Sequence, residues 1–145
     1  LGTNGADDIS TGNGNDVVRA RGGNDQIDGG NGKDDLSGNQ GGDTINGGNG
    51  KDIIFGGIGN DTLTGGNGKD IFLFLNGNGG RRSGNDTITD FHNDLIDLSN
   101  YSTDFDTLAA NFTDVDGNAV IETGHGTITL IGVSSADLSA SDFIF

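Results

Sequence analysis

The sequence predicts an all-β fold: a coil of two parallel, short-stranded sheets, followed by a C-terminal β-rich cap that contains one short helix. The first observation behind this is a nine-residue period that runs through residues 2–73 without an insertion. The second is that every one of the eight units has aspartate at its sixth position and an apolar residue at its eighth. The third is the composition, because 29 glycines and only 30% hydrophobic residues leave little material for a conventional core. Internal repeats of this length indicate a solenoid-type architecture.

Each repeat predicts one short strand and one turn. Positions seven to nine place one inward-facing apolar side chain between two outward-facing ones, as in a three-residue strand. The glycine-rich positions one to six turn the chain. One circuit therefore takes two repeats, so odd-numbered and even-numbered repeats stack on opposite sides, about 4.8 Å apart. The repeats begin at Gly2, Thr11, Ala20, Gly29, Gly38, Gly47, Gly56 and Gly65.

This stacking places the repeat aspartates in two ladders of like charge, whose members repel one another. A cation between successive circuits removes the repulsion, and turn carbonyls with a carboxylate above and below form a cage of oxygen atoms. Such a cage suits calcium, which accepts six to eight oxygen ligands with loose geometry. Zinc is disfavoured, because the chain has no cysteine and its two histidines lie outside the repeats. The odd ladder is Asp7, Asp25, Asp43 and Asp61, and the even ladder is Asp16, Asp34, Asp52 and Asp70.

The predicted calcium ligands are these eight aspartates and the turn residues that surround them. Pairs of aspartates one circuit apart give up to six sites, the strongest of them joining Asp34, Asp52 and Asp70. Alternate carbonyls along an extended turn are expected to face opposite neighbours. Side chains at Thr3, Thr11, Ala20 and Arg21 replace glycines and weaken the first cages. The further predicted ligands are Gly14, Gly29, Gly30, Asn31, Gly32, Lys33, Gly41, Gly47, Gly48, Asn49, Gly50, Lys51, Gly56, Gly57, Gly59, Gly65, Gly66, Gly68, Asp86 and Asp90.

One buried apolar side chain per nine residues contributes far less free energy than the backbone loses in conformational entropy. We therefore expect the repeats to be disordered without calcium, so that folding and ion binding are coupled.

The repeat pattern G-G-x-G-x-D-x-U-x, in which U is apolar, resembles the calcium-binding nonapeptide of the repeats-in-toxin (RTX) family. The resemblance implies a right-handed parallel β-roll with calcium between turns n and n+2. Beyond the repeats, D-x-I-x-D-F, D-x-I-D-L-S, G-x-I-T-L-x-G-V and a terminal D-F-I-F are similar to the C-termini of RTX exoproteins, including serralysin-type proteases. This similarity implies an uncleaved signal for type I secretion, at about residues 134–145.

The sequence divides into a β-roll over residues 1–73 and, over residues 74–145, an eroded ninth repeat with a capping and secretion segment. A glycine and asparagine loop is expected at residues 76–80. Residues 81–89 then resume the repeat register, with Gly84 and Asp86 at positions four and six. Asp86 is accordingly expected to complete a further site with Asp70. Asp94 and Asp97 are expected at the surface or in the cap.

The cap has one helix candidate, residues 102–112, which Ser102 or Thr103 could cap. Two alternating runs at residues 118–123 and 127–133 predict a hairpin about Gly124-His125-Gly126. Asp116-Gly117 predicts a turn just before them. The apolar end, residues 143–145, is expected to pack in the cap, to serve as part of the export signal, or both.

These features favour a secreted, non-catalytic calcium module over an enzyme, because no catalytic constellation is found. A formal net charge of −15 makes nucleic acid an improbable partner, and no membrane-spanning run is present. The chain opens inside the repeat register, so a longer parent protein is expected.

One alternative stays open: an accessory module that binds an anionic polysaccharide, similar to the repeat modules of alginate epimerases. Its binding face would have to come from Arg19, Arg21, Lys33, Lys51, Lys69, Arg81 and Arg82.

Overall fold

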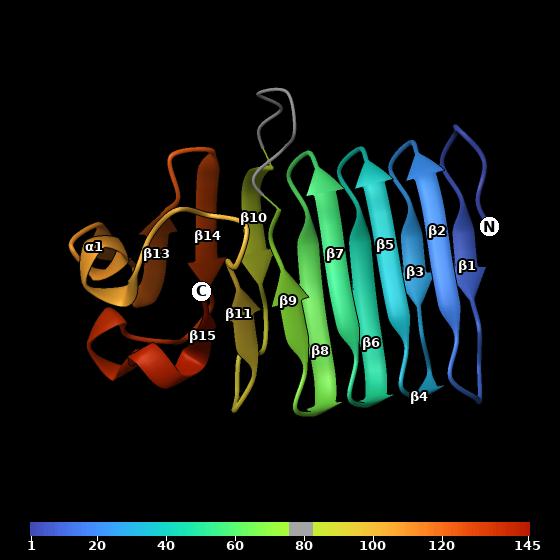
Figure 1. Ribbon diagram of the computed structural model, residues 1–145. Coiled ribbons are helices and arrows are strands. Elements are labelled where there is room, and N and C mark those ends of the chain that lie inside the picture. The colour runs from blue at the N-terminus through green and yellow to red at the C-terminus, as the bar shows by residue number, and fades with distance from the viewer. Residues whose placement is uncertain (76–82) are drawn as a thin grey trace.

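The computed structural model describes residues 1–75 and 83–145, in which the chain winds into two stacked parallel sheets with a cap at the C-terminal end (Figure 1). Successive repeats alternate between the sheets, so each circuit of two repeats adds one layer to both. The expected loop at residues 76–80, together with Arg81 and Arg82, lies outside the described residues. The strands of the repeats are β1 Asp8–Ser10, β2 Val17–Gly22, β3 Gln26–Asp28, β4 Asn31–Gly32, β5 Asp35–Gln40, β6 Thr44–Gly50, β7 Ile53–Ile58, β8 Thr62–Gly68 and β9 Ile71–Leu73.

The strand register confirms that odd and even repeats stack separately. In one sheet Ile27 pairs with Ile45, and in the other Leu36 pairs with Ile54. Each of these pairs joins residues one circuit of 18 apart, in parallel. The first sheet has the order β1-β3-β6-β8-β10-β14-β13-β12, with β4 also paired to β6, and the second has the order β15-β11-β9-β7-β5-β2.

Several strands are longer than the predicted three residues. β6 and β8 span seven residues each, because the glycine-rich positions one to four stay extended and pair with the next circuit. Gly48 and Gly50 allow this by adopting φ values of 100° and 155°, a region that glycine enters without steric cost. Asn39 and Arg21 hold the corresponding second position at φ values of 76° and 87°.

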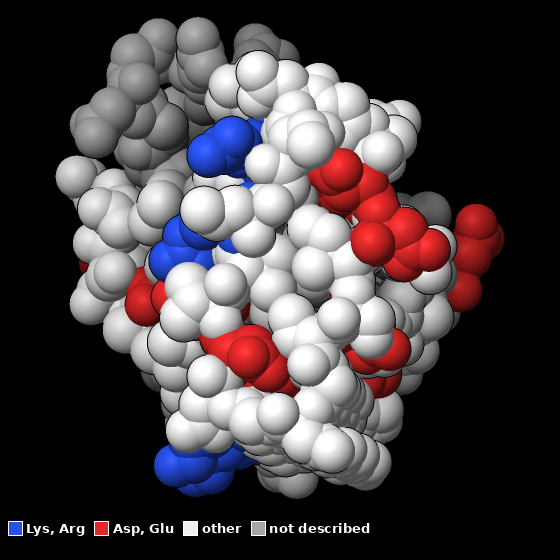
Figure 2. Space-filling view, turned by 90° about the vertical axis from the view of Figure 1, so that its right-hand side faces the viewer, with Lys and Arg blue, Asp and Glu red and all other residues white. Residues whose placement is uncertain are grey.

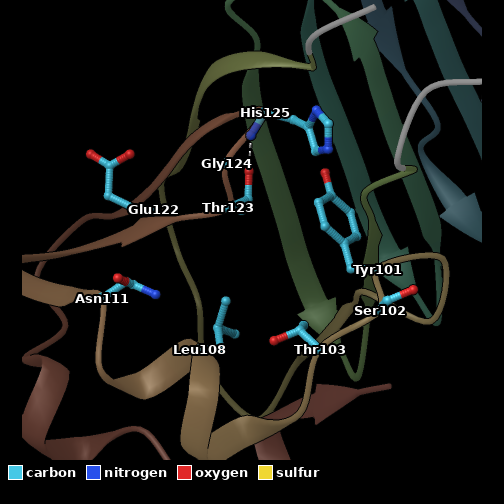
Figure 3. Close-up of a pocket in the computed structure, with 9 residues that line it drawn as sticks. All are labelled: Tyr101, Ser102, Thr103, Leu108, Asn111, Glu122, Thr123, Gly124 and His125. Atoms are coloured by element: carbon cyan, nitrogen blue, oxygen red, sulfur yellow. Dashed lines mark hydrogen bonds between the residues drawn. The ribbon is translucent and has the colours of Figure 1, made fainter. Parts of the chain in front are cut away.

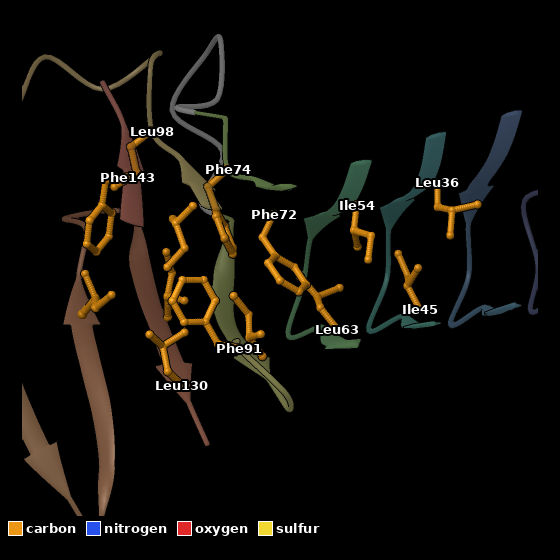
Figure 4. Packing of buried hydrophobic residues seen from close by; sticks show 14 of the residues in the cluster. Leu36, Ile45, Ile54, Leu63, Phe72, Phe74, Phe91, Leu98, Leu130 and Phe143 are labelled. Atoms are coloured by element: carbon orange, nitrogen blue, oxygen red, sulfur yellow. The ribbon is translucent and has the colours of Figure 1, made fainter. Parts of the chain in front are cut away.

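The core of the roll is a single file of position-eight side chains between the two sheets (Figure 4). From Val18 onward each of them is at most 2% exposed, whereas Ile9 in the first circuit is only partly buried. Each such side chain contributes about 1.5–3 kcal/mol of burial. The file is thin, so the roll depends on its turns as much as on its core. Its members are Val18, Ile27, Leu36, Ile45, Ile54, Leu63 and Phe72.

The cap continues both sheets rather than forming a separate layer. β10 pairs in parallel with β8 and β14, and β11 pairs in parallel with β9 and β15. β12, β13 and β14 form an antiparallel meander, which confirms the predicted hairpin and the Asp116-Gly117 turn. This pairing covers strand edges that the roll would otherwise expose. The cap elements are β10 Gly84–Ile88, β11 Leu95–Asp97, α1 Phe105–Ala109, β12 Phe112–Val115, β13 Asn118–Glu122, β14 Gly126–Leu130, the 3-10 turns Ser135–Asp137 and Ala140–Asp142, and β15 Phe143–Ile144.

The helix is shorter than predicted and has a different cap. It begins after Asp104, whose carboxylate accepts a hydrogen bond of 2.8 Å from the Thr107 N–H, so the capping roles predicted for Ser102 and Thr103 are wrong. The helix ends early because Phe112 belongs to β12. No helix of residues 1–75 or 83–145 has the length and apolar character needed to cross a membrane.

Aromatic rings close the cap. Phe143 is buried, and its ring centroid lies 5.7 Å from that of Phe105 and 5.9 Å from that of Phe112. Phe145 stacks on Phe143 at 5.9 Å but stays 41% exposed. The C-terminal Phe143-Ile144-Phe145 segment therefore contributes to the cap core.

Candidate metal centre

One hydrogen bond recurs between the position-six aspartates of successive circuits. The backbone N–H of Asp34 donates to Oδ1 of Asp52 at 2.9 Å, and Asp52 does the same to Asp70. This contact orients each carboxylate toward the preceding circuit, so the strand register itself builds the ladders. The other pairs are Asp7 to Asp25, Asp16 to Asp34, Asp25 to Asp43 and Asp43 to Asp61, each at 2.8 Å.

The second carboxylate oxygen of these aspartates is buried without a hydrogen-bond partner among the described residues. A buried, unpaired carboxylate oxygen is costly, and its recurrence at seven positions needs a common cause. A cation beside each such oxygen would supply that cause. The seven atoms are the Oδ2 oxygens of Asp16, Asp25, Asp34, Asp43, Asp52, Asp61 and Asp70.

The first glycine of a repeat leaves the space into which this oxygen points. A Cβ atom built on Gly47 would lie 2.6 Å from Oδ2 of Asp52 and 2.7 Å from the carbonyl oxygen of Gly65 in the next circuit. At Gly29 the corresponding distances are 2.8 Å to Asp34 and 2.7 Å to the Gly47 carbonyl. The absent Cβ thus opens a cradle between one carboxylate and one carbonyl of successive circuits.

The turn carbonyls alternate in direction, as the extended turn predicts. Gly30 at position two accepts from the Asn49 N–H of the next circuit at 2.7 Å, and Asp34 at position six accepts from Ile53 at 2.8 Å. Asn31 at position three instead accepts from Gly14 of the preceding circuit, at 2.8 Å. A carbonyl oxygen has two lone pairs, so one such hydrogen bond leaves a second lone pair for a cation.

Burial perturbs the acidity of the ladder. It raises the pKa of Asp61 and of Asp70 to about 6. The hydrogen bonds that these carboxylates accept from the backbone N–H groups of Asp43 and Asp52 lower the pKa, but by less than burial raises it. Burial also raises the pKa of Asp43 and of Asp52, and the neighbouring ladder carboxylate adds a smaller repulsive effect. The protein alone therefore disfavours the charged form, and a nearby cation would restore it.

The first two repeats depart from this arrangement. Thr3 donates its backbone N–H to Oδ2 of Asp7 at 2.6 Å and its hydroxyl to the same oxygen at 3.0 Å. The Thr11 hydroxyl donates to the Gly29 carbonyl at 2.7 Å. In these two repeats a threonine hydroxyl therefore donates to an oxygen whose counterpart in the later repeats faces the space left by a glycine.

Past the repeats, the structure corrects two of the predicted placements. Asp86 accepts from the N–H of Asp61 at 3.0 Å, so it continues the odd ladder and does not pair with Asp70. Asp94, expected at the surface or in the cap, takes that place: it accepts from Asp70 at 2.9 Å and is buried beside β11, with only 4% of it exposed. Asp90 lies outside both ladders, where its two oxygens accept from the N–H groups of Gly65 and Gly66 at 2.9 and 2.8 Å.

The expected ligand chemistry is mixed, with carboxylates and backbone groups together. Within residues 1–75 and 83–145, no three acidic, histidine or cysteine side chains converge as a metal cluster. Any ion held between circuits therefore takes part of its shell from carbonyls. A donor set of oxygen atoms alone fits calcium.

A separate cavity of about 490 Å³ lies in the cap, and no sequence pattern pointed to it (Figure 3). Figure 3 shows Tyr101 and His125 on one side of it and Glu122 and Asn111 on the other. The Tyr101 and His125 rings meet edge to face at 5.8 Å. The polar groups thus lie apart and do not surround one point.

Solved structures with the same fold include two subunits of a mannuronan C5-epimerase and an extracellular lipase. The AlgE6R2 subunit of the mannuronan C5-epimerase from Azotobacter vinelandii is 26% identical, with a TM-score of 0.59 over 84% of this chain and 88% of that one. The AlgE6R3 subunit of the same enzyme is 25% identical, with a TM-score of 0.53 over 99% of this chain and 80% of that one.

The extracellular lipase LipA from Serratia marcescens is 17% identical, with a TM-score of 0.52, and shares the fold over the whole of this chain. The chain spans 39% of the length of that lipase. No curated protein matches the sequence.

The family comparison agrees with the geometry of the ladders. A model of the RTX calcium-binding nonapeptide repeat, in four copies, matches residues 1–36, 37–72 and 46–81. These matches cover more than half of the chain and include every glycine cradle described above. Together with the two-sheet roll, they show that the chain belongs to the family of RTX calcium-binding nonapeptide repeats.

Proposed function

We propose that this chain is a non-catalytic module whose β-roll folds when calcium binds between successive circuits. The observation that carries the proposal is the set of buried, unpartnered Oδ2 oxygens on the two ladders. Five of these seven aspartates donate their N–H to a ladder partner that lies one circuit later within the eight repeats: Asp16, Asp25, Asp34, Asp43 and Asp52. The pairs joining Asp34, Asp52 and Asp70 have complete glycine cradles as well, and we expect the tightest binding there.

The physical basis is charge compensation in place of a large core. When bound, calcium supplies positive charge and accepts oxygen ligands from two circuits at once. The aspartates hold their carboxylates in line through the N–H contacts, and the glycines keep side chains out of the cradles. Since the core contributes one apolar side chain per repeat, this cross-circuit linkage is expected to decide whether the roll folds.

The setting we propose is extracellular. Modules of this kind outside the cell bind calcium at roughly 10⁻⁴–10⁻³ M, which leaves the chain unfolded in a calcium-poor cytosol and folded after export. An unfolded, acidic chain can pass through a type I secretion channel, for which residues 134–145 would carry the signal. The similar secreted lipase supports this setting. Any catalytic activity would belong to other parts of a longer protein.

The test is a calcium titration of the chain, followed by far-ultraviolet circular dichroism, with magnesium as the matched control ion. We expect cooperative gain of strand signal with calcium at about 10⁻⁴–10⁻³ M and much weaker gain with magnesium. Full strand signal in excess EDTA would contradict the proposal.

A second candidate function is binding of an anionic polysaccharide along one side of the roll. Lys33, Lys51 and Lys69 are exposed and stand at position five of successive even repeats. Two of these lysines help to line a groove of about 280 Å³, whose lining residues are Lys51, Lys69, Asp52, Ile53, Ile71 and Leu95. At the N-terminal end, basic side chains lie at separate points on one half of the face, with acidic side chains between them (Figure 2). The similar epimerase subunits support a polyuronate as the ligand class.

This candidate is tested by titrating polymannuronate into the chain in calcium buffer. Saturable binding that is lost on changing Lys33, Lys51 and Lys69 to Gln would support it. The matched control changes Arg19, whose guanidinium already pairs with Asp35 at 3.0 Å. Absence of saturable binding by the wild-type chain would exclude this candidate and leave the folding module standing.

A further inference from the structure

Both carboxylate ladders continue past the nonapeptide repeats into the cap. The N–H of Asp61 donates to Oδ1 of Asp86 at 3.0 Å, and the N–H of Asp70 donates to Oδ1 of Asp94 at 2.9 Å. These contacts repeat those inside the roll, although the partners are 25 and 24 residues apart instead of 18. The family match ends at residue 81, so Asp86 and Asp94 lie beyond it.

We call the junction between the last repeats and the cap, where Asp61 meets Asp86 and Asp70 meets Asp94, the seam. Two carboxylate oxygens that would face an ion at the seam have no hydrogen-bond partner among the described residues. Asp61 is 2% exposed and Asp70 is fully buried, and the Oδ2 of each has no hydrogen-bond partner among the described residues. Gly65 leaves a cradle in front of Asp70, since a Cβ there would lie 2.6 Å from its Oδ2. Gly56 does the same for Asp61.

The even ladder ends at Asp94, the residue that follows Asp70 in it. The second oxygen of Asp94 accepts from the His92 N–H at 2.9 Å, so it is satisfied within the protein. Asp90 adds a third carboxylate beside this seam through its contacts with Gly65 and Gly66. The last orphaned oxygens of both ladders therefore belong to the seam between roll and cap.

We propose that two further calcium sites, one between Asp61 and Asp86 and one between Asp70 and Asp94, join the roll to its cap. This inference rests on the proposed calcium-dependent folding of the repeats. Asp86 lies on β10 and Asp94 directly precedes β11, the two strands on which the cap strands β14 and β15 pair. Calcium at the seam thereby makes cap folding depend on the same ion as roll folding.

The test compares Asp86→Asn and Asp94→Asn with the wild-type chain. Asparagine keeps an Oδ1 acceptor for the preceding N–H but removes the charge. Bound calcium is measured by equilibrium dialysis and elemental analysis at saturating calcium, where each variant is expected to lose one ion per chain. The matched control is Asp97→Asn, because Asp97 ends β11 and accepts from Ser99 outside both ladders.

A second readout follows the cap alone. Tyr101 is the single tyrosine of a chain without tryptophan, and it lies in the cap beside His125. We expect the calcium midpoint of its emission to rise about tenfold or more in either seam variant, with the circular dichroism midpoint of the roll shifted less.

The outcomes separate the two proposals. A wild-type chain that binds no calcium would overturn the proposed function and this inference together. A wild-type chain that binds calcium, with both seam variants binding as many ions and showing an unshifted Tyr101 midpoint, would overturn the inference alone. Asp86 and Asp94 would then act purely as hydrogen-bond acceptors. Should one variant fail to fold at saturating calcium, the other tests the same claim on the opposite ladder.

Discussion

The backbone N–H of Asp34 donates to Oδ1 of Asp52, which lies 18 residues later and directly beside it in the next circuit. That contact fixes one oxygen of the carboxylate and leaves the other buried without a partner. Repeated along two ladders, it turns the strand register into a row of candidate cation sites. The following predictions test this arrangement from different sides.

Removing one charge from the middle of a ladder should weaken calcium binding without breaking the strand register. Asp52→Asn keeps an acceptor for the Asp34 N–H but lowers the negative charge of two neighbouring sites. We expect the calcium midpoint of folding, measured by circular dichroism, to rise about tenfold or more. Asp35→Asn, on the outer side of the same sheet, is the control and should shift the midpoint far less. Equal midpoints for wild type and Asp52→Asn would count against the ladder as an ion site.

Filling one glycine cradle should have a similar effect for a steric reason. In Gly47→Ala the new Cβ would meet Oδ2 of Asp52 and the Gly65 carbonyl, so the carboxylate must move. We expect fewer bound ions and a higher calcium midpoint. Gly5→Ala is the matched control, because the nearest atom to its Cβ, Oγ1 of Thr3, is 4.0 Å away and neither glycine has a positive φ. If both variants bind calcium alike, the space at Gly47 has no part in ion binding.

Acid should act in opposite directions on the metal-free and calcium-loaded forms. Burial raises the pKa of Asp86 to about 7 and those of Asp61 and Asp70 to about 6, all above the ordinary value of 3.8. Between about pH 4 and pH 7 the folded form thus binds more protons than the unfolded chain, so its metal-free stability falls as the pH rises.

The measurement is strand signal against pH in EDTA and in calcium. In EDTA we expect signal to increase as the pH is lowered from 8 toward 5. In calcium we expect the midpoint to shift to higher calcium over the same range, because protons compete for the carboxylates. A calcium midpoint that does not change with pH would contradict carboxylate ligation.

The aromatic cluster should stabilise the cap rather than the ladders. Phe143→Ala removes a buried ring that contacts Phe105 and Phe112, which costs about 3–5 kcal/mol. Urea unfolding at saturating calcium, followed by Tyr101 emission, should show the loss. Phe145→Ala is the control, since that ring is 41% exposed, and its effect should be smaller. A Phe143→Ala variant as stable as wild type would show that the cap does not depend on this cluster.

The period of nine was enough to predict the stacking, the ladders and the file of core residues, because one register repeats in every circuit. The seam was predicted incorrectly, since the spacing there changes from 18 to 25 and 24. The D-x-apolar pattern of repeat positions six to eight is still present at Asp86-Thr87-Ile88 and at Asp94-Leu95-Ile96, and the third residue of each is fully buried. This three-residue pattern, rather than the nine-residue spacing, identifies Asp94 as a ladder residue.

The cap was predicted less well because its structure depends on contacts between distant segments. Helix α1 ends before Phe112, whose ring stacks on Phe143 from the chain end. Ser102 and Thr103 follow a turn in which the Tyr101 N–H donates to the Leu98 carbonyl, and Asp104 is the next residue able to cap. The division of the chain at residues 73 and 74, and the individual calcium ligands, stay predictions.

The most direct measurement is a crystal structure grown in calcium, with the ions located by anomalous scattering. We predict ions about 2.3–2.6 Å from their oxygen ligands, beside the Oδ2 atoms of Asp34, Asp52 and Asp70 and between consecutive circuits. Anomalous peaks confined to other parts of the surface, with the ladder carboxylates ordered and no ion between them, would contradict the account.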